Sequence, residues 1–330
     1  MSDSTPVGDP GASVHRPVLV REVLQFLDLG PGLVVVDGTV GGGGHSKLIL
    51  EQLGLDGKLI GLDLDPAMLA RASQALTDAR AILKHGSYAE LPQILDSLGI
   101  SRVDRVLLDL GLSSDQLADA SRGFGIQSGM QSGIQGGGPL DMRFDPSAGP
   151  TASDLLSTLG EAELGDLFER FGEERASRAI ARTIVARRSE LAQWAAADLV
   201  ATVAQSLPRG PKRRHEIHPA TRIFQALRIA VNHELEHLQR FLSVALPDRL
   251  KADGRAVIIS FHSLEDRIVK DAFRDQALWQ NLTPKPVTAR SAEQRMNPRS
   301  RTAKLRAATR KATETPRPIG KSPPPRTIHP

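Results

Sequence analysis

The feature that most constrains the fold of this 330-residue chain is a regular alternation of apolar runs and helix-like segments across residues 33–111. The four apolar runs are "LVVVDG", "KLIGLDLD", "RAILKHGSY" and "VDRVLLDLG", and each predicts a buried strand. Strands that alternate with helices form a parallel sheet with helices on both of its faces. We therefore predict an α/β fold with a doubly wound sheet.

The alternation stops after the fourth strand. Residues 125–139 repeat a Gln-Ser-Gly rhythm that is typical of a loop, and helical patterns fill residues 151–207. A long amphipathic helix is predicted over 220–246, and the run "GRAVIISFHS" then predicts another buried strand. Further strands are expected near 282–289 and 304–309. The pattern thus predicts a helical domain inserted into the sheet.

Composition excludes several kinds of chemistry. The chain has no cysteine, which excludes disulfides, thiolate metal sites and cysteine nucleophiles. No apolar run reaches the ~20 residues of a membrane-spanning helix, and the polar start does not resemble a secretory signal, so we expect a cytoplasmic protein. From Pro284 onward, twelve Lys or Arg stand against two Glu. This basic segment is either a nucleic-acid contact or a solvated end.

Four consecutive glycines follow the first strand in "VDGTVGGGGHSKL". A glycine-rich turn before a helix lets a ligand approach backbone amides at the helix N-terminus. A triphosphate-binding loop needs Lys directly before Ser or Thr, whereas here His45 precedes Ser46 and Lys47 follows it. The spacing therefore excludes the triphosphate class.

Two cofactor classes and one structural explanation remain for this turn. A dinucleotide motif would use Gly41, Gly43 and Ser46, which is an imperfect match. Methyltransferases that use S-adenosyl-L-methionine (AdoMet) resemble the stretch more closely, because an acid ends the first strand and glycines follow, as Asp37, Gly41 and Gly43 do. A tight turn that binds no ligand is the third alternative.

Notable side chains also follow the next three strands. Asp63 ends the second strand, where such folds place an acid that accepts hydrogen bonds from ribose hydroxyls, and Asp65 is expected to cap the following helix. Tyr88 follows the third strand, where it either stacks on adenine or packs in the core. Asp109 ends the fourth strand and either faces the substrate or caps the next helix. Its agreement with the glycine turn and Asp63 favours a functional role.

A series of stretches, in order across residues 15–310, resembles one family. The stretches are "HRPVLVREV", "VDGTVGGGGHS", "GLDLDP", "LLDLGLSSDQL", "RGFG", "GPLDMRFDP", "FGEERASRAIARTIV", "HPATRIFQALRIAVNHELE", "ISFHSLEDRIVK" and "NPRSRTAKLR". Together they resemble the bacterial 16S ribosomal RNA (cytosine-N(4))-methyltransferase family, and they are far more specific than the glycine turn alone.

The resemblance implies a class I AdoMet-dependent methyltransferase fold, Rossmann-like, with an inserted all-helical domain. It implies AdoMet as the cofactor and no metal. The cofactor contacts that it implies are Gly43, Gly44 and His45 at the turn, Asp63 at the ribose, Tyr88 near the adenine, and Asp109 with Gln116 to complete the pocket.

The expected organisation has five parts. They are a flexible N-terminal tail (1–14), the first part of the methyltransferase domain (15–116), an inserted helical substrate-recognition domain (117–215), the second part of the methyltransferase domain (216–312) and a disordered basic, proline-rich tail (313–330).

The implied reaction is AdoMet-dependent N(4)-methylation of a specific cytosine in the decoding region of 16S ribosomal RNA, in the small ribosomal subunit. Methylation at pyrimidine carbon 5 normally needs a cysteine adduct, which this chain cannot form. We expect Asp109, with backbone carbonyls of residues 110–113, to orient the amine of the cytosine. His262 and His218 are alternative polar contacts.

Basic residues supply candidate contacts to the RNA phosphates. They are Arg143, Arg209, Lys212, Arg213, Arg214, Arg295, Arg299, Arg301 and Arg306. Two other classes of function stay open, a non-catalytic RNA-binding or ribosome assembly factor and an NAD-dependent oxidoreductase. A homodimer is plausible for a soluble enzyme, and the sequence contains no pattern that specifies one.

Overall fold

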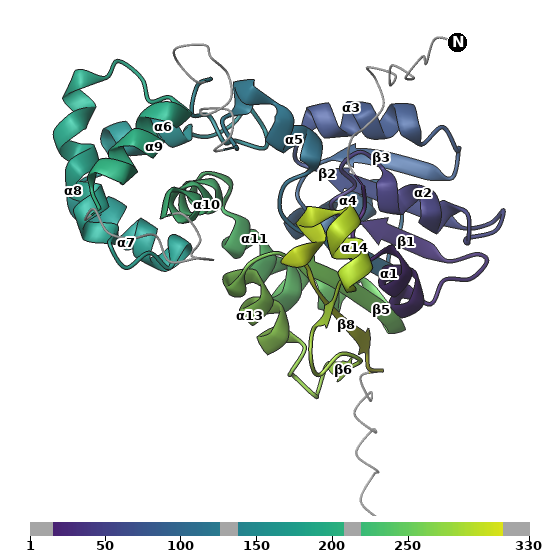
Figure 1. The fold of residues 1–330 in the computed structure, drawn as a ribbon. Coiled ribbons are helices and arrows are strands. Elements are labelled where there is room, and N and C mark those ends of the chain that lie inside the picture. Colours follow the sequence, from purple (N-terminus) through teal and green to yellow (C-terminus); the bar gives the residue numbers. More distant parts are fainter. Residues whose placement is uncertain (1–15, 126–137, 208–218, 313–330) are drawn as a thin grey trace, which may run out of the picture.

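A single mixed sheet organises the protein (Figure 1). The structure is a computed structural model, and it describes residues 16–125, 138–207 and 219–312. Within these residues, eight strands form one sheet in the order β3-β2-β1-β4-β5-β8-β6, and β7 pairs with β8. The parallel strands are β1 (Val34–Asp37), β2 (Lys58–Asp63), β3 (Ala81–His85), β4 (Val103–Asp109) and β5 (Leu250–Ser260). The predicted parallel sheet is therefore confirmed as far as β5.

The far edge of the sheet is antiparallel. Its strands are β6 (Trp279–Asn281), β7 (Val287–Thr288) and β8 (Lys304–Arg310). The strand expected near 304–309 is confirmed, but the one expected over 282–289 is wrong, because β6 and β7 are two short strands with a break between them. Pro284 and Pro286 lie in that break, and proline has no N–H for a strand hydrogen bond.

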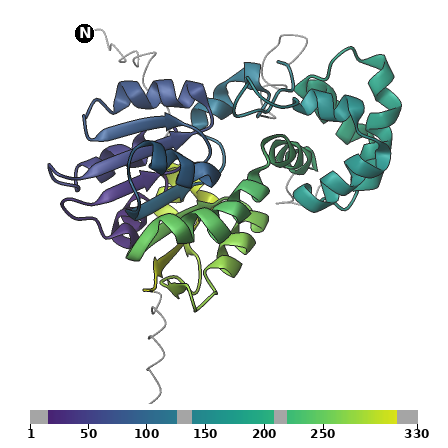
Figure 2. The same ribbon diagram turned by 180° about the vertical axis from the view of Figure 1, so that it is seen from behind.

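Helices cover both faces of the sheet, as the alternating pattern predicted (Figure 2). Successive strand residues point to opposite faces, so that Val35 belongs to one hydrophobic cluster and Val36 to the other. The first face is covered by α1 (Val20–Leu27), α2 (Gly44–Leu50) and α3 (Pro66–Ala75). The second is covered by α4 (Leu91–Ser97), the π-helical turn η5 (Phe241–Ala245), α12 (Leu246–Arg249) and α13 (Ser263–Ala272).

A group of helices stands beside the sheet and has its own hydrophobic core (Figure 1). The group comprises α6 (Ala152–Thr158), α7 (Glu161–Gly172), α8 (Ser177–Arg187), α9 (Ala196–Gln205) and α10 (Pro219–Asn232). Its core contains Phe168 and Trp194, both fully enclosed, and continues to Val231 in α10. This hydrophobic core thus extends past residue 215, where we expected the helical segment to end.

The helix predicted over 220–246 is wrong as a single helix. It breaks at His233, whose φ of 49° is left-handed, and α11 (Glu234–Arg240) begins there. The apolar stripe continues on both sides of the break, so a helical periodicity does not reveal a one-residue change of direction. The break directs α10 into the helical group and α11 onto the sheet.

Short elements complete the described chain. They are α5 (Ser114–Ala118), α14 (Ser291–Met296) and the 3₁₀ turns η1 (Tyr88–Glu90), η2 (Ala120–Arg122), η4 (Arg188–Glu190) and η6 (Pro298–Arg301). The Gln-Ser-Gly repeat and both chain tails lie outside the described residues. Among the helices of the described residues, none combines the length and the apolar character that crossing a membrane would require.

Candidate active site

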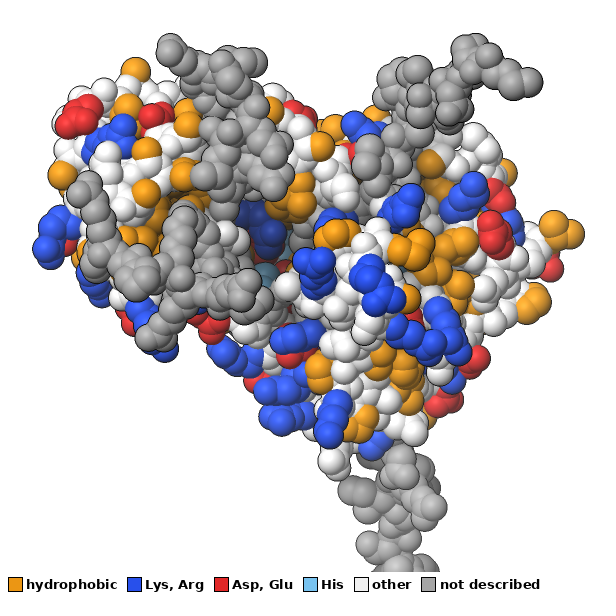
Figure 3. Space-filling model, viewed as in Figure 1, with side chains coloured by type: hydrophobic (Ala, Val, Ile, Leu, Met, Phe, Trp, Pro, Cys, Tyr) orange, Lys and Arg blue, Asp and Glu red, His pale blue; other side chains and the backbone are white. Residues whose placement is uncertain are grey.

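A cleft opens at the carboxyl ends of β1 to β4, and Figure 3 shows the hollow between the helical group and the sheet. It encloses about 930 Å³ with its open mouth included, which is enough for a cofactor-sized ligand. Of the residues expected to contact the cofactor, those that line the cleft are Gly44, His45, Asp63, Tyr88, Asp109 and Gln116. Gly43 is absent from the lining that the described residues form.

The glycine turn is held by the acid that ends β1. Asp37 is buried and accepts hydrogen bonds from the hydroxyl of Ser46 (2.7 Å) and the amide of Thr39 (3.3 Å). Asp37 therefore ties the start of α2 to the sheet and does not line the cleft itself. Gly41, with φ of 51°, donates its amide to Oδ2 of Asp63 (2.9 Å).

Gly43 supports the turn from the side away from the cleft. Its φ is 85°, and a Cβ atom there would lie 3.1 Å from the side chain of Leu76. Its amide already donates to the carbonyl of Val40 (2.8 Å). Gly43 is thus outside the cleft lining of the described residues, and its contact with the cofactor stays a prediction.

The carboxylate of Asp63 stands at the end of β2 and faces the cleft. It accepts amide hydrogen bonds from Gly41 and Asp65, both at 2.9 Å. Burial raises the pKa of Asp63 to about 7, against the lowering effect of the two amides, and the neighbouring carboxylate of Asp65 raises it further. Hydroxyl donors from a bound ribose would stabilise the ionised form, so Asp63 fits the ribose position.

Tyr88 packs in the core, as one of its two alternatives predicted, and it also lines the cleft, so its contact with adenine stays a prediction. Its ring meets that of Phe241 edge-on at 5.4 Å between centroids, and burial raises the pKa of its phenol. His237 and Leu238 of α11 line the same region. The sequence placed Leu238 only in the apolar stripe of one long predicted helix and did not single out His237.

One carboxylate oxygen of Asp109 has no hydrogen-bond partner within the part of the chain that the structure describes. Its amide donates to the hydroxyl of Thr39 (2.6 Å), and its Oδ2 lies 3.7 Å from Nδ1 of His45. Its Oδ1 is buried and has no hydrogen-bond partner among the described residues. The hypothesis that Asp109 caps the next helix is wrong, because the side chain of Ser113 caps α5. Burying an acceptor without a hydrogen bond costs free energy, and a ligand that donates a hydrogen bond to Oδ1 would offset this cost.

Burial and two neighbouring basic side chains act in opposite directions on the pKa of Asp109. Burial raises its pKa, whereas His45 and Arg299 act in the opposite direction. Arg299 was expected to contact RNA phosphates, and it lies instead in the wall of the cleft. Its guanidinium stacks over the ring of Phe261 at 5.6 Å and donates to the carbonyl of Leu112.

Two acids in the cleft lining escaped the sequence analysis. Glu234 forms a two-point ion pair with Arg228 (2.7 and 3.0 Å). Glu265 lies 3.1 Å from Nε2 of His262 and accepts the amide of Phe261. Their signal was present in "NHELE" and "FHSLED", but only the break at residue 233 places Glu234 at the start of α11, in the cleft that Glu265 of α13 also lines.

Glu234, Glu265 and the neighbouring His262 form a cluster whose spacing would suit a metal ion. The ligand atoms of Glu234, His262 and Glu265 lie within 4.8 Å of one another. The guanidinium of Arg228 already neutralises both oxygens of Glu234, which opposes a second cation there. His262 pairs with Glu265 rather than lining the cleft, contrary to its expected role as a polar contact.

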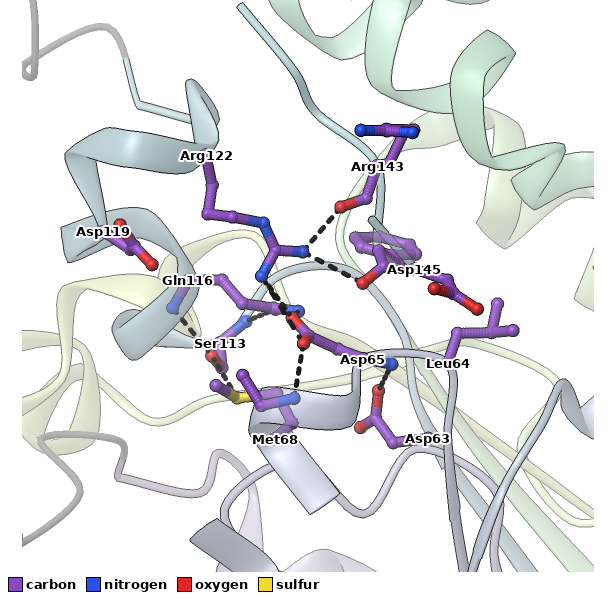
Figure 4. A network of polar contacts seen from close by, with 12 residues as sticks. Asp63, Leu64, Asp65, Met68, Ser113, Gln116, Asp119, Arg122, Arg143 and Asp145 are labelled. Atoms are coloured by element: carbon purple, nitrogen blue, oxygen red, sulfur yellow. Dashed lines mark hydrogen bonds and ion pairs between the residues drawn. The ribbon is translucent and has the colours of Figure 1, made fainter. Parts of the chain in front are cut away.

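The amide of Gln116 is engaged within the protein (Figure 4). Its nitrogen donates to Asp65 (2.8 Å), and its oxygen accepts the amide of Ser113 (2.9 Å). Asp65 is fully buried and accepts the amide of Ala67, which confirms that it caps α3. Gln116 therefore supports one wall of the cleft through the helix caps on either side.

The expected RNA contacts divide into three groups. Arg143 pairs with Asp141 (2.8 Å), and Arg306 is buried in β8 and pairs with Asp266 (2.6 Å), so the expectation for Arg306 is wrong. Exposed positions remain in α14 and η6, and Figure 3 shows Lys and Arg side chains gathered on this face beside the hollow. They include Arg295 and Arg301. Outside the described residues lie Arg209, Lys212, Arg213, Arg214 and His218.

The strand order, with antiparallel β8 next to β5, and the acids and glycines at the ends of β1, β2 and β4 define a class I methyltransferase fold. The chain belongs to the MraW methylase family, whose model matches residues 12–311.

Curated relatives agree with this family. The chain is 45% identical over 320 residues to the ribosomal RNA small subunit methyltransferase H of Syntrophobacter fumaroxidans, an alignment that spans 91% of this chain and 97% of the relative. It is 44% identical over 323 residues to the protein of the same name from Thermomicrobium roseum, with 92% and 95% covered. It is 46% identical over 316 residues to that of Trichlorobacter lovleyi, with 89% and 97% covered.

Proposed function

We propose that this protein transfers a methyl group from AdoMet to N4 of a cytosine in the decoding region of the 16S ribosomal RNA of the small subunit. Membership of a methylase family supports the reaction type, and the names of the relatives support ribosomal RNA as the substrate. The observation that supports the choice of an amine is the buried Oδ1 of Asp109 at the end of β4, which accepts no hydrogen bond from the described part of the chain. An NAD-dependent oxidoreductase does not agree with the family.

The residues of the cleft fit AdoMet. Asp63 offers a carboxylate to the ribose hydroxyls, and Gly41 and Gly44 line the cleft without side chains that would fill it. Tyr88 supplies an aromatic ring for the adenine end. When bound, AdoMet supplies a methyl group on a positive sulfonium, which is a strong electrophile. The protein must therefore provide alignment and exclude water.

Asp109 performs the alignment. The exocyclic amine of cytosine is a poor nucleophile because its lone pair is delocalised into the ring. Accepting one of its N–H bonds at Oδ1 aims the amine and favours its attack on the methyl carbon, while the bond from that carbon to sulfur breaks. Burial raises the pKa of Asp109, and His45 and Arg299 offset part of this rise, which favours the ionised acceptor relative to burial alone. The proton of the methylated amine then leaves to water.

The experiment incubates the protein with AdoMet carrying a labelled methyl group and with small ribosomal subunits that lack the modification. Digestion of the RNA and mass spectrometry identify any methylated nucleoside, and free 16S RNA serves as a second substrate. N(4)-methylcytidine at one position is the expected product. Label in another nucleoside contradicts the amine proposal. Binding of subunits without any transfer favours the alternative, a non-catalytic assembly factor.

A further inference from the structure

The guanidinium of Arg122 connects two walls of the cleft (Figure 4). Its Nη1 lies 3.2 Å from Oδ2 of Asp65, and its Nη2 donates to the carbonyls of Arg143 (2.6 Å) and Phe144 (2.9 Å). The Arg122 side chain is 12% exposed and that of Asp65 is fully buried. A planar guanidinium can serve all three acceptors together, whereas an ammonium group is a point charge on a flexible stem.

The Asp65 end of this connection is rigid. The carboxylate of Asp65 also accepts the amide of Ala67 (2.9 Å) and the side chain of Gln116 (2.8 Å). Its own amide donates to Asp63, the acid in the ribose position. Arg122 is therefore anchored on the strand end that forms the cofactor side of the cleft.

The other end of the connection holds an aromatic ring in the lining. Phe144 lines the cleft, and its amide donates to the side chain of Asn232 in α10 (2.7 Å). Its ring lies 5.7 Å from that of Phe124, over which the guanidinium of Arg122 sits at 5.5 Å. On the surface, Asp145 lies 3.4 Å from Nε2 of His85. The turn at residues 143–145 is thus fixed from both the sheet and the helical group.

The backbone around Arg122 is adapted to this contact. Gly123 has φ of 71°, and a Cβ atom there would lie 2.6 Å from the carbonyl oxygen of Pro139. The amide of Met142 donates to the carbonyl of Arg122 (2.9 Å). Only glycine at 123 lets the chain before Phe144 pass this close to η2.

We propose that Arg122 is a positioning residue that fixes Phe144 as the surface on which the acceptor base stacks. A base that is splayed out of its RNA strand is commonly held against an aromatic ring. Phe144 shares the cleft lining with Asp109, the acceptor for the amine. This inference rests on the proposed methyl transfer to RNA and adds the group that holds the plane of the base.

A double-mutant cycle tests the inference with small ribosomal subunits as the substrate. The variants are Arg122→Lys, Phe144→Ala and the two together, and the measurements are kcat, KM for the subunits and Kd for AdoMet. We expect Phe144→Ala and Arg122→Lys each to lower kcat/KM for the subunits about tenfold or more. The Kd for AdoMet stays within about twofold of wild type, and the double variant is no worse than Phe144→Ala, because residues that act as a unit are not additive.

Arg249→Lys is the matched control. Arg249 is 16% exposed, pairs with Asp96 (2.7 Å) and donates to the carbonyl of Ser101 (3.2 Å), before the start of β4 and therefore at the end of the sheet away from the cleft. It makes the same kinds of bonds as Arg122, so it reports the general cost of replacing a guanidinium. We expect Arg249→Lys to keep the wild-type kcat/KM.

Three results overturn the inference. They are a wild-type kcat/KM for Phe144→Ala, multiplied losses in the double variant, and a Kd for AdoMet that rises as much as kcat/KM falls. If Arg122→Lys does not fold, as judged by its melting transition, Arg122→Gln takes its place in the cycle, and the result for Phe144→Ala stands independently. A wild-type protein that transfers no methyl group contradicts the proposed function, whereas an active wild type with unaffected variants contradicts only the role of Arg122.

Discussion

The two sides of the cleft differ in how their polar groups are satisfied. The cofactor side consists of the loops after β1, β2 and β3 (38–45, 63–64 and 86–88), and its main acid, Asp63, accepts two amides from neighbouring loops. The acceptor side consists of residues 109–116 with Phe144, Asn232, Glu234, Glu265 and Arg299. There Asp109 keeps a buried oxygen without a partner in the described chain.

From this difference we expect the cofactor side to bind a ligand and the acceptor side to take part in the reaction. Groups on the cofactor side are fixed by local hydrogen bonds, so they can form a stable surface before any RNA arrives. Groups on the acceptor side come from segments far apart in the sequence and carry charges whose ionisation depends on one another. Substitutions on the two sides should therefore affect different kinetic constants.

The largest effect is expected on the acceptor side. Asp109→Asn should lower kcat for methyl transfer about a hundredfold or more, because the amide no longer provides an ionised acceptor for the amine. The Kd for AdoMet should change much less, since the groups of the cofactor side are untouched. Single-turnover kinetics and calorimetry measure the two quantities. Asp271→Asn, on the exposed part of α13, is the control, and a normal rate in Asp109→Asn would remove this residue from the mechanism.

On the cofactor side, Asp63→Asn should raise the Kd for AdoMet about 10- to 100-fold, because hydrogen bonds to a charged group contribute roughly 1.5–3 kcal/mol. At saturating AdoMet the kcat should stay close to that of the wild type. Calorimetric titration measures the affinity. A loss of kcat as large as that of Asp109→Asn would show that the two sides do not act separately.

The pH dependence of AdoMet affinity is a further test of the difference between the two sides of the cleft. The pKa of Asp63 is raised to about 7 in the free protein, so ligand binding to its ionised form weakens below that pH. Affinity should rise about tenfold from pH 6 to pH 8 in the wild type, and this slope should be absent in Asp63→Asn.

The contribution of Asp63 to folding stability changes with pH in the opposite direction to the AdoMet affinity. Because the folded protein holds the proton more tightly than the unfolded chain does, the contribution of Asp63 declines as the pH rises from about 4 to 7, and is constant above that range. Chemical denaturation of the AdoMet-free protein at pH 5 and pH 8, with Asp63→Asn for comparison, measures this contribution. Equal pH dependence in both proteins would contradict the raised pKa.

The smallest effect is expected at the rim of the acceptor side. Arg301 is exposed in η6, and Arg301→Gln should weaken binding of the small subunit about threefold and reduce its salt dependence by the equivalent of one phosphate contact. Binding isotherms at several salt concentrations give both values. Arg182→Gln, an exposed change on α8, is the control. Equal losses in both variants would mean that the rim of the cleft has no special part in RNA binding.

Much of the cofactor side could be predicted from the sequence. The glycine turn follows β1 and Asp63 ends β2, and parallel strands bring their carboxyl ends to one edge of a sheet. Within the glycine turn, Gly44 lines the cleft whereas Gly43 does not, and the sequence does not distinguish these adjacent glycines. The family resemblance identified the glycine turn as part of the site. Only the tertiary structure distinguishes a residue that lines the cleft from one that supports it.

The acceptor side shows what local patterns leave open. Arg299 and Arg306 belong to one basic segment, yet one lines the cleft and the other is buried against Asp266. Glu234 reaches the cleft only because the chain turns at His233. Charge and periodicity do not predict which of these residues line the cleft, because they describe a single segment and carry no information on the segments that pack against it.

By itself, then, the sequence determined the doubly wound sheet, the inserted helices, the methylase family and the acids at the strand ends. These depend on short-range periodicity and on the order of strands, which the chain encodes locally. Tertiary structure alone decided that Phe144, Glu234, Glu265 and Arg299 would face Asp109 across one cleft. Their separation along the chain exceeds the reach of any local pattern, and they meet only because the helical group and the sheet pack separately and share that boundary.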